Sequence, residues 1–477
     1  MKQICILVLL VSIVCANSFA AGLEDADYTT PDSWSQHVVS NGFKIEGKQH
    51  DLAGGNTEVS LTTRYNLESN DYASDQNIYQ YLRVKVADVQ LGTGTVSGAV
   101  FFRGATDIDG DDGKQWGETY NYFFNDTLDV EEEENDYAPR LYHAFVKLSD
   151  FVKGSQLTLG RMYVDHLSLF HLDGADADVS FADERLKLFA YGGHPVSFYV
   201  DNDDNSLYGG GIELKPFEKL KLRAAYTSLD IFDEDTDFAM VRADLFLDLG
   251  SLYGEYSSVD NSGYYKIGGT ARISKTKTTV NVDYTELLDQ IGYEDGSYVT
   301  NQFTNTLFPY GDYKKIRVKI SQGVTDFLVL GVGTELKDAD NTDLTNRDYA
   351  KYSAYIDLVR VPTENTYISL NADYWDVDNA ADAGDNKSFT FGGQITQVVS
   401  DKLDVWAGTW FERFQYDEED DEIRDWVRNY YVGGQYSYND TFSVTCDLSY
   451  EDSEVLEKDS SDMKDTLSAE IWVNFSI

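Results

Sequence analysis

This chain has little cysteine, little proline and no long hydrophobic stretch after its first twenty residues. A transmembrane helix needs about 20 consecutive apolar residues, so the sequence excludes a helical membrane protein. Only 3 of the 477 residues are Cys and 6 are Pro. Two of the cysteines, Cys5 and Cys15, fall in the N-terminal segment, which leaves Cys446 alone if that segment is removed. Neither an intramolecular disulfide nor a thiolate metal cluster could then form.

Positive charge is scarce as well. The chain carries 38 Lys and Arg against 83 Asp and Glu, a formal net charge of -45 at pH 7. This excess of negative charge disfavours nucleic acid as a partner and favours cations or cationic proteins near the surface. The sequence has no Cys-x-x-Cys-His motif for haem attachment, and no Ser, His and Asp arrangement stands out. We therefore predict that the protein is not an enzyme and attaches no c-type haem itself.

The first twenty residues have the features of a secretory signal peptide. Lys2 supplies a positive charge, residues 4–14 form the apolar core, and Ser18-Phe19-Ala20 is a small-x-small cleavage site. We predict cleavage after Ala20; a lipoprotein anchored at Cys15 is the weaker alternative, because the preceding Val14 is large. Residues 21–56 would then form a periplasmic or lumenal extension, or the first strand.

What the chain has in abundance is alternation of apolar and polar residues. In its last eleven residues the apolar parity comprises Leu467, Ala469, Ile471, Val473, Phe475 and Ile477. Successive side chains of a β-strand point to opposite faces, so this segment is a strand with one apolar face, and such a strand needs a partner along its edge. Similar segments of about 9 to 14 residues recur along the chain from residue 57 onwards. Aromatic residues make up 14% of the chain, which is typical of the aromatic girdles that membrane barrels carry at both interfaces. The pattern predicts an all-β fold, a single transmembrane antiparallel meander β-barrel of about 22 strands, within roughly 18 to 24, over residues 57–477.

The connections between these segments fall into two unequal classes. Short turns are predicted at residues 215–218, 248–250, 274–275, 322–325, 362–365, 399–402 and 439–440. Longer acidic connections are predicted at residues 230–237, 288–312, 337–348, 376–387, 417–425 and 452–464. In outer-membrane barrels short turns face the periplasm and long loops face the outside, so we expect the same arrangement here.

If the apolar parity faces lipid, the other parity lines the lumen. The cations predicted to line it are Arg64, Arg83, Lys85, Arg103, Lys221, Arg223, Arg242, Lys266, Arg272, Lys315, Arg317, Lys319 and Lys351. The predicted inward acids concentrate later, at Asp357, Asp373, Asp404, Asp447, Glu451 and Glu470, with Glu213, Asp244, Glu255 and Asp283 earlier. Consecutive strands of a meander are neighbours, so one wall should be cationic and the opposite wall more anionic. Such a lining would discriminate solutes by charge. In the alternative interpretation the charges pair with one another and only keep the interior hydrated, although like charges at alternate positions of residues 315–319 repel unless partners lie nearby.

Three short runs resemble Gram-negative outer-membrane porins. They are residues 141–148 (LYHAFVKL), 157–162 (LTLGRM) and 172–175 (LDGA), a small part of the chain. The resemblance implies a β-barrel porin in the bacterial outer membrane. In that family the Arg after the Gly commonly lies near the pore interior, which makes Arg161 a candidate for the pore lining. Strict alternation from Leu157 and Leu159 instead places Arg161 on the lipid side. The two predictions agree only if Gly160 forms a bulge that shifts the alternation, or if Arg161 lies at the rim of the barrel. The chain departs from the family in ending on Ile477 where Phe or Trp is typical.

The longest predicted connection, residues 105–139, holds the candidate metal ligands. Asp107, Asp109, Asp111 and Asp112 place oxygen atoms around Gly110, as a Ca²⁺ loop requires, but the bidentate Glu of an EF-hand is missing. We predict by default that this segment is a solvated acidic surface loop, with weak calcium binding as the alternative. The aromatic run at residues 120–124 also suits a loop that folds inward and constricts the pore. His143, His166, His171 and His194 lie close in sequence without a metal-binding motif, so we predict no other cofactor.

These features lead to two functional hypotheses. The first is an outer-membrane porin, a water-filled channel for passive diffusion of small hydrophilic solutes or ions, with outer-membrane lipid around it. Its apolar outer faces are equally suited to homotrimer contacts. The alternative is a structural barrel that sheaths a partner, such as a multihaem cytochrome in an outer-membrane electron conduit. A barrel of about 22 strands is large enough for either.

Overall fold

The computed structural model describes residues 50–52, 55–69, 74–108, 138–167, 169–196, 205–231, 234–259, 262–288, 312–339, 348–378, 386–418, 421–453 and 465–476. Every regular element in these ranges is a β-strand. No helix within them is both long and apolar enough to span a bilayer. The predicted signal peptide and residues 21–49 lie outside the described residues.

The strands follow one another along the chain with short gaps. They are β1 His50–Leu52, β2 Gly55–Ser69, β3 Ser74–Leu91, β4 Gly94–Asp107, β5 Ala138–Ser149, β6 Ser155–Val164, β7 Phe170–Phe181, β8 Leu186–Pro195, β9 Ser206–Phe217, β10 Leu220–Ile231, β11 Glu234–Leu247, β12 Gly250–Val259, β13 Ser262–Ile273, β14 Thr278–Leu287, β15 Tyr313–Gly323, β16 Leu328–Ala339, β17 Tyr349–Val359, β18 Thr366–Val377, β19 Asn386–Ser400, β20 Leu403–Glu418, β21 Asp421–Asn439, β22 Phe442–Ser453 and β23 Asp465–Ser476.

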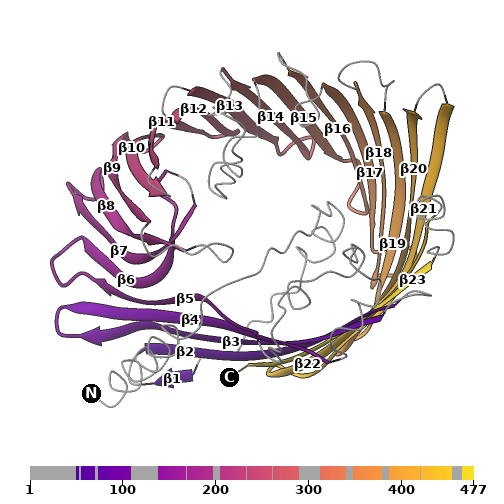
Figure 1. Cartoon of the computed structure of the whole chain (residues 1–477), viewed down its shortest axis with the longest axis horizontal. Helices are drawn as coiled ribbons and strands as arrows, with labels where there is room; N and C mark the ends of the chain where they lie inside the picture. Colours follow the sequence, from indigo (N-terminus) through magenta and orange to yellow (C-terminus); the bar gives the residue numbers. More distant parts are fainter. Residues whose placement is uncertain are drawn as a thin grey trace.

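These strands form one closed antiparallel meander (Figure 1). Each strand pairs with the next, and β23 returns to pair with β2 from Ser60↔Ser476 to Ser69↔Leu467. The short β1 pairs with β2 alone, so 22 of the 23 strands make up the barrel. Closure gives the edges of the first and last strands hydrogen-bonding partners, as the interior of a bilayer requires. The predicted fold class and strand number are confirmed, and the first barrel strand begins at Gly55.

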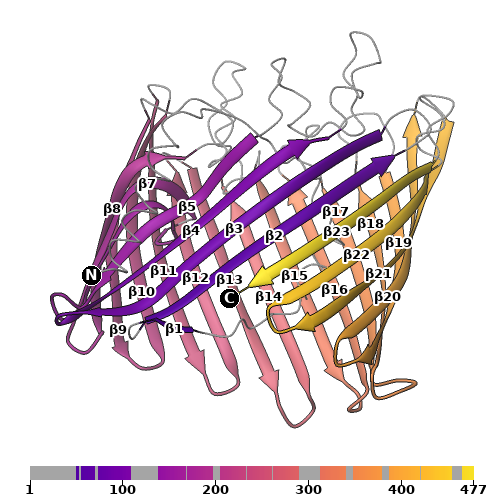
Figure 2. The same ribbon diagram turned by 90° about the horizontal axis from the view of Figure 1, so that it is seen from below.

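Short turns gather at one end of the barrel, where the lower hairpins of Figure 2 lie. Turns at residues 218–219, 248–249, 274–277, 401–402 and 440–441 fall at or next to predicted positions. Two predicted long connections, at residues 230–237 and 417–425, were wrong, because the strands extend far into both of them. The β10–β11 pair runs to Ile231↔Glu234 and the β20–β21 pair to Glu418↔Asp421. Residues with high strand propensity, such as Tyr416 opposite Ile423, lie among the acids and maintain the pairing.

The outward parity carries large exposed apolar side chains. Ile267 is 58% exposed, Val332 56% and Leu252 51%, and each faces away from the lumen. Exposing such side chains to water costs about 25 cal/mol per Å² of apolar surface. A lipid environment removes this cost, so the exterior fits a hydrocarbon layer.

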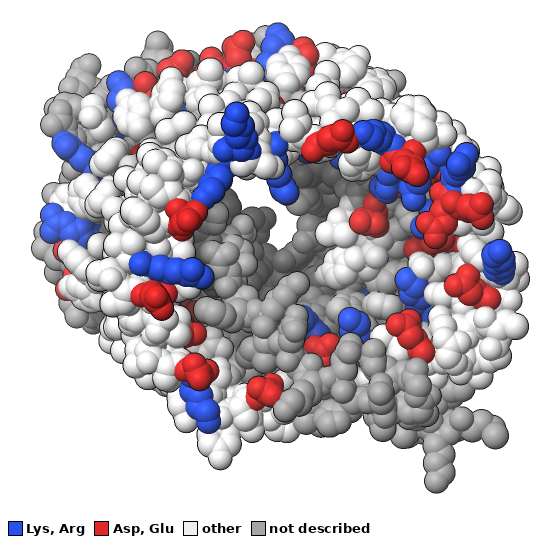
Figure 3. Space-filling model, turned by 180° about the vertical axis from the view of Figure 1, so that it is seen from behind, with Lys and Arg blue, Asp and Glu red and all other residues white. Residues whose placement is uncertain are grey.

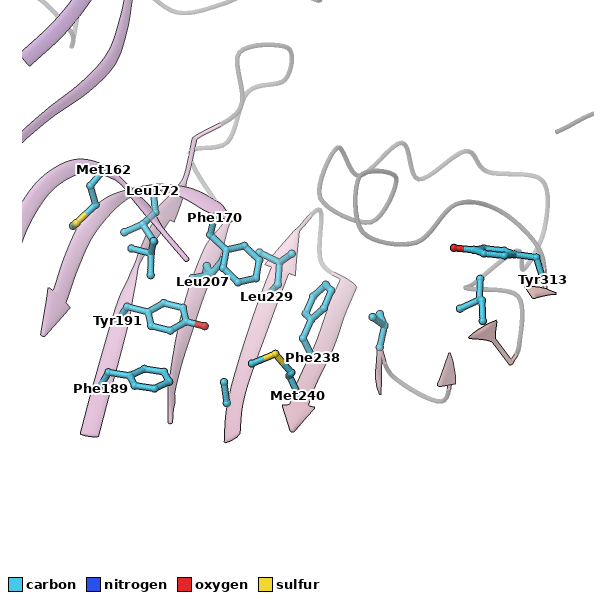
Figure 4. Packing of buried hydrophobic residues seen from close by; sticks show 14 of the residues in the cluster. Met162, Phe170, Leu172, Phe189, Tyr191, Leu207, Leu229, Phe238, Met240 and Tyr313 are labelled. Atoms are coloured by element: carbon cyan, nitrogen blue, oxygen red, sulfur yellow. The ribbon is translucent and has the colours of Figure 1, made fainter. Parts of the chain in front are cut away.

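Inward-facing apolar residues form a cluster at the loop end of β6 to β16. Figure 4 shows Phe189 and Tyr191 of β8 facing Phe238 and Met240 of β11, with Phe170 between them. Phe170 and Phe238 make an edge-to-face contact with ring centroids 6.2 Å apart. Because both rings are almost fully buried, this part of the interior is packed rather than hydrated.

Candidate functional site: the lumenal wall

The register of the sheet places the predicted charged residues on one continuous inward face. Direct partners on this face include Arg223↔Arg242, Glu255↔Lys266 and Asp447↔Glu470. The same rows of partners extend around the barrel through Arg64, Arg83, Lys85, Arg103, Lys221, Arg272, Lys315, Arg317, Lys319, Asp357, Asp373 and Asp404. This face lies opposite the exposed apolar side chains. Figure 3 shows the end of the barrel turned away in Figure 1; it is hollowed, with charged side chains around the hollow.

The repulsion expected among Lys315, Arg317 and Lys319 is relieved by an acid on the next strand. Glu335 of β16 accepts a 2.5 Å hydrogen bond from Arg317 and lies 3.8 Å from the Lys315 ammonium. Tyr349 donates a hydrogen bond to the other oxygen of the same carboxylate. Sequence reasoning missed Glu335, although it stands on the polar parity of a strand whose other parity includes the apolar Leu330, Val332 and Leu336.

Other cations of this wall are compensated in the same way. Glu213 of β9 lies 2.9 Å from Lys221 and 3.2 Å from Arg223. Arg242 lies 2.8 Å from Asp244 and 2.9 Å from Glu255. The predicted cationic wall is therefore a mixed wall, because acids interleave with the cations from strand to strand.

Five of the predicted cations on the inward face form no ion pair within the described part of the chain: Arg83, Lys85, Lys266, Arg272 and Lys319. The Lys319 ammonium lies 5.4 Å from the Tyr355 ring centroid and the Lys266 ammonium 5.8 Å from that of Tyr253. In Figure 1, β3 lies across the barrel from β13 to β15. These five cations thus come from two facing walls.

Acids dominate the inward face of β17 to β23. They are Asp357, Asp373, Asp404, Glu412, Asp447, Glu451 and Glu470. Among the described residues of these strands, Lys351 is the inward cation, 4.0 Å from Asp373. Glu470 is neutralised by Arg64 across the junction of the last and first barrel strands. The more anionic wall lies in the later strands, where the sequence places the acids.

Hydrogen bonds across inward-facing glycines hold several polar side chains close to the wall. Trp406 of β20 donates a 2.7 Å bond to Asp447 of β22, across Gly433 of β21. Tyr431 donates a 3.0 Å bond to Gln394 across Gly408. A Cβ atom at Gly433 would lie 2.2 Å from the Asp447 carboxylate, so these bridges require glycine on the intervening strand.

Arg161 lies on the outward face, so the position implied by the family resemblance was wrong. Neither sheet pairing of β6 shifts register at Gly160, although that residue has a φ of +121°. Arg161 therefore keeps the parity of Leu159 and Tyr163. Its guanidinium donates 2.8 and 2.6 Å hydrogen bonds to the two carboxylate oxygens of Asp173, which satisfies the charge on this face.

The other candidate ligands do not form a metal site among the described residues. His166 lies 2.8 Å from Asp176, while His171 and His194 bond to the carbonyl oxygens of Tyr142 and Asn205. No group of three or more metal-ligating side chains occurs in the described ranges. Asp109, Asp111 and Asp112 and the side chain of Asp107 lie outside the described residues, so the calcium prediction stays a prediction.

Comparisons with known proteins give structural matches. No protein-family model matches the chain, and no curated protein matches it. The outer membrane protein OpdK of Pseudomonas aeruginosa is 12% identical, covers 88% of this chain and 98% of its own, and has a TM-score of 0.46. OccK2 (OpdF) of the same organism, in complex with glucuronate, gives the same four values. OccAB1 of Acinetobacter baumannii is 11% identical, covers 91% of this chain and 99% of its own, and has a TM-score of 0.44.

Nothing in the described part of the chain supports the alternative of a barrel built around a multihaem cytochrome. The strand pairing within this chain closes the sheet and defines the barrel fold. The chain is similar in structure to these three proteins over 88% to 91% of its length.

Proposed function

We propose that the protein is an outer-membrane channel through which small hydrophilic solutes or ions diffuse passively. One observation carries this proposal: a closed barrel of 22 strands has an apolar exterior and an inward face rich in charged residues. Charged side chains on the inside hold water, whereas an apolar exterior is solvated by lipid. Small solutes are the class that a hydrated interior of this kind admits.

The arrangement of charge favours weak selectivity over exclusion of one sign. Uncompensated cations such as Lys266 and Lys319 come from walls that also carry acids, and acids such as Asp404 and Asp447 line the later strands. A solute inside the barrel would therefore meet a field across the lumen, which orients dipoles and charged groups. Both cations and anions should pass.

Single-channel recording in planar bilayers tests the proposal. Protein lacking residues 1–20, folded and purified in detergent, should insert and give stepwise currents proportional to voltage. Folding is checked beforehand by the change in electrophoretic mobility on heating, and the size of the detergent complex reports whether a homotrimer forms. Folded protein that inserts without current would overturn the proposal.

A further inference from the structure

The outward face of β19 to β21 carries three cations whose side chains the structure describes: Lys387, Arg413 and Arg428. The register places Arg413 opposite Phe389 and Arg428 opposite Phe411. Phe389 is 43% exposed on the lipid-facing parity, and both arginines are exposed as well. Positive charge therefore stands on three neighbouring strands of the face that meets lipid.

These cations lie at the loop-end edge of the apolar exterior, opposite the end where the lower hairpins of Figure 2 lie. Lys387 belongs to the register pair of β19 and β20 nearest the loops, and Arg428 lies opposite Asp452 in the second such pair of β21 and β22. Further from the loops, the same parity carries Phe391, 46% exposed, and Tyr430, 49% exposed. An outward arginine is costly at the bilayer midplane and nearly neutral at the interfaces. The cations thus fit the boundary between hydrocarbon and lipid head groups.

The two arginines form no ion pair within the described part of the chain, with Asp452 or with any other acid. The Arg428 guanidinium carbon instead lies 3.9 Å from the centroid of the Trp426 ring. A guanidinium stacked on a ring keeps the N–H donors at its edge available for a further partner. Arg161, the outward arginine of β6, differs because an acid of the next strand neutralises it.

The spacing of the two arginines suits one shared anion. Arg413 and Arg428 are diagonal neighbours across the β20–β21 ladder, a relationship that separates residues by about 7–8 Å. The planar donors of a guanidinium match the oxygen atoms of a phosphate group, so both side chains can reach the same phosphate from opposite sides. Lys387 is the diagonal neighbour of Arg413 on the other side, but its register partner is the acid Asp376. The argument therefore rests on the two arginines.

We propose that Arg413 and Arg428 bind the phosphate group of a lipid in the outer leaflet of the outer membrane. The acyl chains of that lipid would lie on the exposed rings of Phe391 and Tyr430. The chain has a formal net charge of -45, so general attraction of anions to the protein does not account for such binding. The site lies outside the lumen and is independent of the proposed channel function.

The test uses lipid A, a glycolipid with two phosphate groups, as its probe. Protein lacking residues 1–20, folded in a non-ionic detergent, is titrated with lipid A, and native mass spectrometry measures the fraction of protein that retains one lipid. Lipid A stripped of both phosphates is the matched probe, because its sugars and acyl chains are the same. We expect the phosphorylated lipid to bind about tenfold more tightly.

Two double variants test the residues. Arg413→Gln/Arg428→Gln should bring the two affinities to within about twofold of each other. Lys275→Gln/Lys402→Gln removes the same charge from turns at the other end of the barrel and should keep the full preference. Heat-dependent electrophoretic mobility checks folding. If the double arginine variant does not fold, each single arginine variant replaces it, with an expected loss of about threefold.

The remaining outcomes separate a lipid from other occupants. Equal binding of the two probes by the unmodified protein, or a preference that persists without the arginines, would overturn the proposal. Displacement of lipid A by excess inorganic phosphate would also overturn it, because the site would then take free anions. A smaller detergent complex in the double arginine variant would assign the arginines to a contact between copies of this chain instead.

Channel recordings keep this test apart from that of the proposed function. The double arginine variant should give the same zero-current potential as the unmodified protein, because both arginines face outward. A shifted potential would place them beside the ion path and overturn the lipid site. Selective binding of lipid A by a protein that carries no current would support the lipid site and count against the channel.

Discussion

Tyr253 donates a 2.5 Å hydrogen bond to Asp283, although the two residues lie on β12 and β14 with β13 between them. Gly268 of β13 stands directly between the partners. A Cβ atom there would lie 2.5 Å from the Asp283 carboxylate and 2.6 Å from the Tyr253 hydroxyl. The bridge therefore depends on glycine, and it holds both side chains along the wall.

Gly268→Ala should break this bridge and lower stability. The added methyl group displaces the Tyr253 hydroxyl and leaves the Asp283 carboxylate without its donor, at a cost of about 1–3 kcal/mol. Urea unfolding of the detergent-folded protein measures the change. Gly254→Ala is the matched control, because a Cβ at that position meets nothing within 4 Å. If both variants unfold alike, the bridge contributes nothing.

Glu335→Gln should make the channel more selective for anions. The substitution removes the carboxylate that compensates Lys315 and Arg317, so the local positive potential rises. We expect the anion-to-cation permeability ratio to rise roughly twofold, measured as the zero-current potential in a KCl gradient. Asp326→Asn, the same charge change in a turn at the barrel end where Asp326 pairs with Lys277, should have little effect.

Charge reversal of Lys315, Arg317 and Lys319 should shift ion selectivity towards cations. An unchanged zero-current potential would show that these residues do not line the ion path.

Arg161→Met should destabilise the barrel without changing ion selectivity. The substitution leaves the Asp173 carboxylate unpaired on the outward face, at a cost of about 1–3 kcal/mol. Adding Asp173→Leu should restore much of this loss, since both members of the pair are then apolar. A change in the zero-current potential of Arg161→Met would instead place this residue near the pore.

Cys446 provides a test of which parity faces outward. It is exposed and pairs with Ile471 on the apolar side of β22 and β23. In protein lacking residues 1–20 and reconstituted in liposomes, it should react with an apolar maleimide and resist a charged one. Thr445→Cys in a Cys446→Ala background should show the opposite preference, because Thr445 faces inward beside Trp472. Equal labelling of both sites by the charged reagent would contradict the assignment of faces.

The sequence by itself determined the strands and their two faces. Alternation is a local property with a period of two residues, so Ile316, Val318 and Ile320 could be assigned to one face and Lys315, Arg317 and Lys319 to the other without knowledge of any partner. The final strand likewise indicated closure, which the pairing of β23 with β2 confirms. Acidic composition was a poorer guide, since acids such as Asp230, Asp235, Asp417 and Glu422 lie within paired strands.

Only the tertiary structure decided which side chains meet. The pairing of Arg317 with Glu335, the bridge from Tyr253 to Asp283 and the stacking of Tyr81 on Trp472 all join residues on different strands. Their contacts depend on the register of each strand against its neighbours and on the closure of the sheet. The alternation along one strand contains neither, because a strand keeps the same two faces whichever residues lie opposite it.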